Sequence, residues 1–110
     1  MTSIIIYTTE ETLNHKKGLK EGEESCTFFY WEFSKMPKRI DGKDLIFFAT
    51  KKFIRGYFLI EDLDDYSVEW SCESWIDIKP IPTKSFQGFK YADKVPELKK
   101  YIKRECIKFV

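Results

Sequence analysis

Three tryptophans are the side chains of this 110-residue chain best suited to binding a flat ligand: Trp31, Trp70 and Trp75. A nucleobase that stacks on an aromatic ring gains about 1–3 kcal/mol. Large rings are mostly buried in proteins, so any of the three could belong to the core instead. Trp75 is the best candidate for a pocket, because it follows a polar turn that ends at Ser74. We therefore predict that these four residues contribute to a binding site.

Three cations lie close together at one end of an expected β-hairpin. Lys51 and Lys52 form its turn, and Arg55 follows in the second strand. Cations placed beside stacking rings can follow the phosphates of a nucleic-acid strand. We assign these three residues to the same site, which predicts a nucleic acid or a nucleotide as partner.

Residues for catalysis or metal binding are sparse. His15 is the only histidine, and Cys26, Cys72 and Cys106 form no Cys-x-x-Cys pair. The acidic loop at residues 61–65 lacks the internal glycine and the distant glutamate of a calcium loop. No catalytic triad and no glycine-rich phosphate loop can be assembled. We expect no catalytic residue, no metal and no cofactor, which favours a binding protein over an enzyme.

The formal net charge of +1 conceals a separation of charge along the chain. Residues 1–78 hold 10 Lys and Arg against 15 Asp and Glu, a balance of −5, whereas residues 79–110 hold 9 against 3, a balance of +6. This asymmetry can steer an anionic partner onto one end, although near neutrality argues against strong nonspecific nucleic-acid binding. The basic C-terminal segment could contact phosphates or an acidic protein, or simply be solvated.

The cysteines and the N-terminal residues indicate where the protein works. Three cysteines are an odd number, and the first residues do not resemble a signal peptide, which indicates a reducing compartment. The apolar run at residues 4–6 is too short to cross a bilayer. We expect a cytoplasmic protein that is not inserted into a membrane.

Short segments rich in β-branched and aromatic residues must position these side chains. Residues 45–50 are apolar on both faces, which predicts a central strand, and Gly56 in the next strand indicates a bulge, a corner or a close backbone approach. Residues 85–91 are expected to form a last strand or a pocket wall. The other expected strands are residues 3–8, 26–34, 53–60, 66–70 and 75–78. Alternation along residues 26–34 places Phe29, Trp31 and Phe33 on one face of that strand. Helices are expected at residues 10–20 and 94–108.

This content predicts one α+β domain over residues 1–110. A chain of this length can bury a single core, and an aromatic content of 17% suits sheets better than helical bundles. We expect a small mixed β-barrel of about six strands, with one C-terminal helix and a short N-terminal helix.

Several short motifs between residues 29 and 60 resemble those of the PUA-like superfamily, and of its EVE domains in particular. They are Tyr30-Trp31, the exit from Ser34 to Pro37, the turn Gly42-Lys43-Asp44, the strand from Leu45 to Phe48, and Ile54-Arg55-Gly56. The resemblance implies a PUA-like barrel with a cleft at its side, in which an aromatic cage holds a flipped and sometimes modified base.

Three functions remain open. The first, which the resemblance favours, is noncatalytic binding of RNA or DNA. The second is a small amidohydrolase similar to ASCH domains, acting on a modified nucleoside with a Lys, Thr and Glu set; here Lys16-Lys17-Gly18 is followed by Leu19, without the Lys-Thr pair of that family. The third is a protein-interaction module, which would present a flat apolar patch and could have a protein partner.

Overall fold

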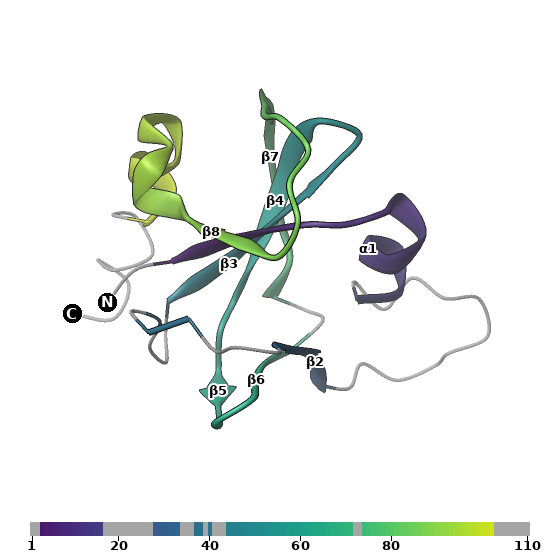
Figure 1. The fold of residues 1–110 in the computed structure, drawn as a ribbon, viewed down its shortest axis with the longest axis vertical. Helices are drawn as coiled ribbons and strands as arrows, with labels where there is room; N and C mark the ends of the chain where they lie inside the picture. The colour runs from purple at the N-terminus through teal and green to yellow at the C-terminus, as the bar shows by residue number, and fades with distance from the viewer. Residues whose placement is uncertain are drawn as a thin grey trace.

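The computed structural model describes residues 3–16, 28–33, 37–38, 40, 44–71 and 74–102. Figure 1 shows two sheets with short helices at their margins. The strands are β1 (Ile4–Tyr7), β2 (Phe28–Glu32), β3 (Leu45–Thr50), β4 (Phe53–Leu59), β5 (Asp62–Leu63), β6 (Ser67–Ser71), β7 (Ile76–Pro82) and β8 (Phe89–Tyr91). The helical elements are α1 (Glu10–Lys16) and the 3-10 turns η2 (Ala92–Lys94) and η3 (Pro96–Leu98).

The larger sheet has five strands in the order β7-β4-β3-β1-β8, with β3 in the middle. β1 runs parallel to β3, and the other neighbours are antiparallel. Every residue of β3 is buried. Both faces of a central strand are covered, so a continuous apolar run is stable there. The predicted central strand at residues 45–50 is confirmed.

The smaller sheet, β2-β6-β5, packs against one face of the larger sheet. Trp70 of β6 stacks on Phe58 of β4, with ring centroids 4.9 Å apart and an interplanar angle of 25°. We call the buried residues on this face the first core cluster. They are Ile4, Ile6, Leu13, Phe33, Ile46, Phe48, Phe58, Ile60, Val68 and Trp70.

A second core cluster covers the opposite face of the larger sheet and includes residues of the C-terminal turns. Its buried members are Ile5, Leu45, Phe47, Ala49, Ile54, Tyr57, Ile78, Ala92 and Leu98. Alternation along β1 explains the division, because successive side chains of a strand point to opposite faces. Ile4 and Ile6 join the first cluster, whereas Ile5 joins the second.

α1 follows β1 directly and begins at a threonine cap. The Thr9 hydroxyl accepts a hydrogen bond from the backbone N–H of Thr12 at 3.1 Å, which satisfies one of the donors left open at a helix start. Leu13 anchors the helix in the first core cluster. The helix expected at residues 10–20 is thus present as Glu10–Lys16, and residues 17–20 lie outside the described part of the chain.

The C-terminal segment differs from the continuous helix expected at residues 94–108. η2 and η3 are separated by Val95, whose backbone is extended with φ −118° and ψ 100°. A residue that precedes a proline is driven out of the helical region, and Pro96 has this effect on Val95. A helical turn then covers residues 99–102, while residues 103–110 lie outside the described part.

The α+β class predicted from the sequence is confirmed, since far more of the described residues lie in strands than in helices. The described strands number eight instead of about six. The two-residue β5 lies in the segment expected to be an acidic loop, whereas β8 lies in residues 85–91, where a last strand or a pocket wall was expected. Their ladders form two sheets, and within the described residues no ladder joins the sheets into a closed barrel. Within the same residues, no helix has the length and apolar character needed to cross a bilayer.

Gly56 sits at irregularities in both of its ladders, as its sequence position predicted. The β3–β4 pairing shifts between Phe48 and Ala49, which leaves Arg55 as the extra residue of a bulge in β4. The β4–β7 pairing also shifts between Ile54 and Gly56. The bulge turns the Arg55 side chain out of the regular alternation of β4.

Asp64 organises the turn between β5 and β6. Its Oδ1 atom accepts hydrogen bonds from the backbone N–H groups of Tyr66 at 2.7 Å and Ser67 at 2.8 Å. The Ser67 hydroxyl also contacts both carboxylate oxygens at 3.2 Å. These donors favour the charged carboxylate, above all the backbone N–H of Tyr66, and hold the pKa of Asp64 below its usual 3.8.

Asp64→Asn is therefore expected to reduce stability at neutral pH and to matter less in acid. A carboxylate whose pKa is lowered by folding contributes stability above its unfolded pKa, and that contribution disappears as the pH falls through the lowered value. Thermal unfolding of both proteins between about pH 7 and pH 2 would measure this. Asp65→Asn, at the exposed neighbouring position, is the control. A deficit that stays constant across this range would contradict the prediction.

Candidate functional site

A cavity of about 390 Å³ opens between β2, the end of β1 and the segment that leads into β8. Its size lies within the roughly 300–1,000 Å³ typical of small-molecule sites. We call it the aromatic cavity, since four of its residues carry rings. It is lined by Tyr7, Trp31, Glu32, Phe33, Gln87, Gly88 and Phe89.

The rings of the aromatic cavity are held by the sheets behind them. Trp31 meets Phe48 of β3 edge to face, with centroids 5.6 Å apart. Phe33 meets Phe89 in the same manner at 5.8 Å, across the gap between the β2 strand and β8. Because Phe48 is fully buried in the central strand, the wall that carries Trp31 rests on the close-packed core of the larger sheet.

Polar groups lie at the solvent side of the aromatic cavity. Glu32 and Gln87 are exposed, and strand alternation directs the Glu32 side chain away from Trp31 and Phe33. Gly88 has φ +75°, and a Cβ atom added there would meet nothing within 4 Å. Beside the rings, the mouth therefore offers the Gln87 amide and the bare backbone at Gly88 as possible hydrogen-bonding groups.

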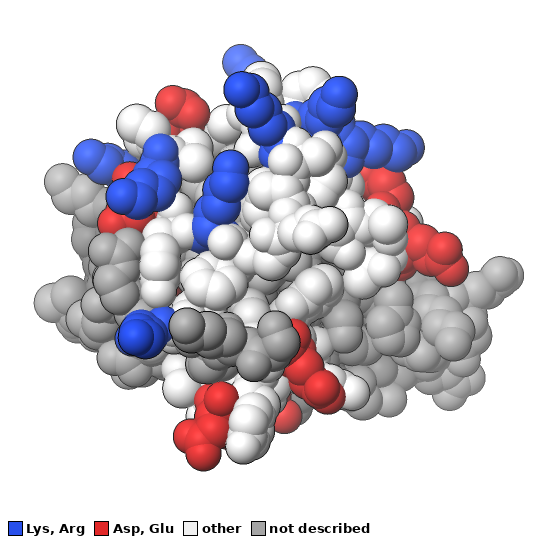
Figure 2. Space-filling view, in the orientation of Figure 1, with Lys and Arg blue, Asp and Glu red and all other residues white. Residues whose placement is uncertain are grey.

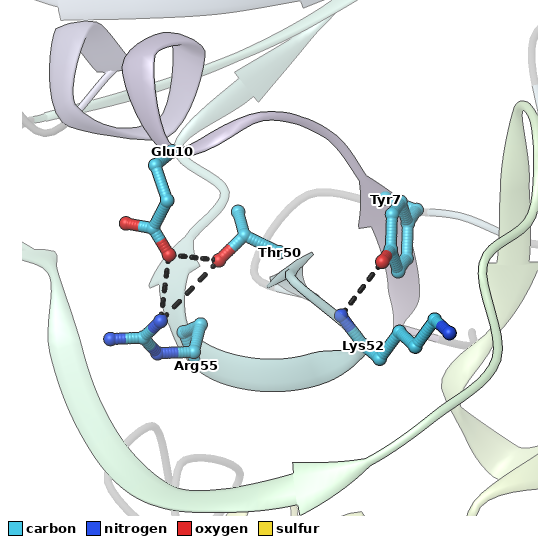
Figure 3. Close-up of polar contacts among 5 residues, drawn as sticks. All are labelled: Tyr7, Glu10, Thr50, Lys52 and Arg55. Atoms are coloured by element: carbon cyan, nitrogen blue, oxygen red, sulfur yellow. Dashed lines mark hydrogen bonds and ion pairs between the residues drawn. The ribbon is translucent and has the colours of Figure 1, made fainter.

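The β3–β4 turn lies beside the cavity and is tied to it by Tyr7 (Figure 3). The Tyr7 hydroxyl accepts a hydrogen bond from the backbone N–H of Lys52 at 2.7 Å and one from the Ser85 hydroxyl at 3.2 Å. The backbone N–H of Thr83 donates to the Lys52 carbonyl at 2.9 Å. Lys51 and Lys52 are both exposed, so their ammonium groups extend into solvent from a fixed backbone.

Arg55 has a different role from its two lysine neighbours. Its Nη1 atom donates to Glu10 Oε1 at 2.7 Å, and the Thr50 hydroxyl donates to the same oxygen (Figure 3). The two charged side chains keep 40% and 30% of their surface exposed, so the ion pair is partly screened by water. This contact connects the start of α1 to β3 and β4, and it neutralises the Arg55 charge.

The predicted tryptophans occupy three different environments. Trp31 lines the aromatic cavity and is half-buried. Trp70 has no exposed surface, so neither of its ring faces is open to a base. Trp75 is half-buried, packs on Phe58 at 4.9 Å, and donates its indole N–H to Asp77 at 2.8 Å.

Ser74 also has a structural contact in this region. Its hydroxyl accepts a hydrogen bond from the backbone N–H of Leu59 at 3.3 Å, at the end of β4. Neither Ser74 nor Trp75 belongs to the described lining of the aromatic cavity. The structure thus brings Trp31 and the lysine pair towards Tyr7, and places Ser74, Trp70 and Trp75 elsewhere.

Most other cavity residues were not singled out in the sequence as ligand contacts. Gln87, Gly88 and Phe89 do fall in the stretch at residues 85–91, which was expected to form a strand or a pocket wall, and it contributes to both. Phe33 was placed on the Trp31 face of its strand by alternation alone. Tyr7 gave no signal, because its role depends on contacts with Lys52 and Ser85, which are distant in sequence.

Charge is separated in space as well as along the chain (Figure 2). Most blue side chains lie in the upper half of the view, over the β3–β4 turn, β7 and the C-terminal turns, and the bottom, over the β5–β6 hairpin, is red. Further red side chains lie at the right edge and among the blue ones at the upper left. That hairpin has five exposed acids, Glu61, Asp62, Asp64, Asp65 and Glu69. Within the described residues no three His, Cys, Asp or Glu side chains are grouped so that they could hold a metal ion.

Comparison with known proteins leaves this site to be interpreted from its own geometry. A scan against protein-family models found no match, and searches of curated proteins and of solved structures found no significant match.

Proposed function

We propose that this protein binds single-stranded RNA or DNA without catalysis and holds one base, plain or modified, in the aromatic cavity. The observation that carries the proposal is the cavity itself, with Trp31, Phe33 and Phe89 around a space large enough for a nucleobase. Proteins bind unpaired bases by stacking them on such rings, and they discriminate among bases by hydrogen bonds at the base edges. Gln87 at the mouth can supply such bonds.

The wider surface supports an anionic polymer as ligand. The exposed lysines of the β3–β4 turn are joined to the cavity wall through Tyr7. The acidic β5–β6 hairpin lies at the opposite end of the molecule from that turn (Figure 1). A strand held near the lysines is repelled from the acidic end, which limits how it can be oriented. We also propose that residues 1–110 form one PUA-like domain, in which the two sheets form a barrel, and that it acts in the cytoplasm.

An amidohydrolase has less support. Thr50, Glu10 and Arg55 do place a hydroxyl beside a carboxylate, which is the kind of pair that such an enzyme would need. However, Thr50 has no exposed surface, so a substrate carbonyl cannot approach its hydroxyl. The cluster is explained by its structural role at the start of α1.

A protein-interaction module that pairs through the β7 edge of the larger sheet is also disfavoured. In β7 the N–H of Thr83 points inward to Lys52, so alternation directs positions 80 and 82 to the free edge. Both positions are proline, which lacks the donor that an added strand would need.

Trp31→Ala is expected to weaken nucleoside binding roughly 5- to 150-fold, the equivalent of one lost stacking contact of about 1–3 kcal/mol. Isothermal titration calorimetry with a panel of plain and methylated nucleosides would measure the change. Trp75→Ala is the matched control, because Trp75 is also a half-buried tryptophan packed on a core phenylalanine but lies outside the cavity.

The exposed Gln87 allows a second test that is independent of folding. Gln87→Ala should preserve the melting temperature and alter the ranking of nucleosides in the panel, because it removes a hydrogen-bonding group from the mouth. If folded Trp31→Ala and Gln87→Ala proteins bound every nucleoside as the parent protein does, the proposal would be wrong.

A further inference from the structure

The β3–β4 turn has lysine at two positions where lysine is a poor structural choice. Thr50 pairs with Phe53, so Lys51 and Lys52 alone form the loop, and their φ values are 49° and 67°. A two-residue hairpin loop with both φ values positive is a type I′ turn, which favours Asn-Gly because a Cβ atom is crowded in this conformation. Fold stability therefore does not account for these two lysines.

The backbone of this turn is nevertheless held firmly. Lys52 uses its N–H for the Tyr7 hydroxyl and its carbonyl for the N–H of Thr83. Tyr7 in turn lines the aromatic cavity, and its hydroxyl accepts a hydrogen bond from the Ser85 hydroxyl. One tyrosine thus connects the wall of the cavity with the position of both lysines.

The ammonium groups of the turn are available to a ligand. Lys51 and Lys52 are exposed, and neither forms an ion pair with a carboxylate in the described part of the chain. Arg55, by contrast, is paired with Glu10. Lys84, also exposed, follows Thr83 directly and adds a third cation beside the turn. Backbone strain retained at exposed charged residues is typical of functional positions.

We propose that Lys51 and Lys52 bind the phosphodiester next to the base held in the aromatic cavity, and that Tyr7 is the positioning residue that sets the turn relative to the cavity. This inference rests on the proposed function and narrows the ligand to a nucleotide within a strand, as opposed to a free base. Arg55 is excluded from the phosphate contacts, and Tyr7 is added to the residues on which affinity depends.

The double variant Lys51→Asn, Lys52→Gly separates the roles of charge and fold. It installs the residues that a type I′ turn favours, so the melting temperature should rise. Affinity for short single-stranded RNA and DNA oligonucleotides should nonetheless fall roughly tenfold or more at low salt, because two phosphate contacts are lost. The slope of log K against log salt should become shallower by about 1.4, or about 0.7 per contact on a single strand. Nucleoside binding should not change.

Lys94→Gln with Lys99→Gln is the charge-matched control. Both lysines are exposed on the C-terminal turns, and the pair removes the same number of charges. This control should leave the salt slope close to that of the parent protein. Equal losses in the two double variants would mean that affinity follows net charge only, and the assignment to the β3–β4 turn would be overturned.

Tyr7→Phe tests the positioning role, since it keeps the ring and removes only the hydroxyl that accepts from Lys52. Oligonucleotide affinity should fall several-fold, and the slope of log K against log salt should be intermediate between those of the parent and the turn variant. If the parent protein binds nucleosides, and both the turn variant and Tyr7→Phe bind oligonucleotides as the parent does, this inference is overturned while the proposed function stands. A parent protein that binds neither nucleosides nor oligonucleotides would overturn the proposed function, and this inference with it.

Discussion

Trp70→Ala is expected to lower the free energy of unfolding by about 3–5 kcal/mol, as truncation of a fully buried large aromatic residue does. Trp70 has no exposed surface, stacks on Phe58 and meets Phe48 edge to face at 5.7 Å, so its removal leaves a cavity between the two sheets. Domains of this size have a total stability of about 5–15 kcal/mol. The melting temperature should therefore fall by more than about 10 °C.

Chemical denaturation monitored by circular dichroism would measure this loss, with Trp75→Ala as the comparison. Trp75 is only half-buried, although it also contacts Phe58, so its truncation should cost clearly less. Trp70→Phe should recover part of the stability because it refills part of the volume. Equal costs for the two alanine variants would show that Trp70 is not the centre of the first core cluster.

The three tryptophans show why the candidate site was only partly predictable. Alternation placed Trp31 on the face of its strand shared with Phe33, and the structure has both in the cavity wall. Alternation cannot show which face of a strand another sheet will cover. That covering decides the outcome for Trp70, whose ring lies between β6 and β4, and it follows from how the two sheets pack.

The central hairpin was easier to predict than the pairing of strands that are distant in sequence. β3 and β4 have continuous apolar sequences joined by two residues, and hairpin pairing is local. The parallel pairing of β1 with β3, in contrast, joins Ile4 to Ile46 across more than a third of the chain. No local sequence pattern encodes a contact between such distant residues. The arrangement of the two sheets could therefore not be predicted from the sequence.

The cations illustrate the same limit. Lys51, Lys52 and Arg55 were treated as equivalent because they are close in sequence. In the structure a bulge turns Arg55 to Glu10, a residue 45 positions earlier, while the lysines remain exposed. A strand pattern predicts that a bulge will occur near Gly56, but it does not predict which partner the displaced side chain will find.

Gly56→Ala is expected to destabilise the fold by about 1–3 kcal/mol, near the upper end of that range. A Cβ atom at this position would lie 2.4 Å from the Ile76 carbonyl oxygen and 2.5 Å from the Trp75 ring. Alanine in a strand is otherwise favoured over glycine by roughly 0.5–1 kcal/mol, so only the contact can reverse the sign. Urea denaturation of the two proteins would give the difference directly.

Gly88→Ala is the control that separates lack of space from backbone strain. Gly88 has φ +75° and open space around it, so alanine there should cost about 1–2 kcal/mol through the backbone alone. A further Trp75→Leu change should then relieve Gly56→Ala but leave Gly88→Ala unaffected, because only Gly56 lies against the Trp75 ring. Relief should be incomplete, since the Ile76 carbonyl cannot move without disturbing the β4–β7 ladder. Strict additivity of the Gly56 and Trp75 changes would contradict the close approach of ring and backbone, and with it the reason that β4 has a glycine where it pairs with both β3 and β7.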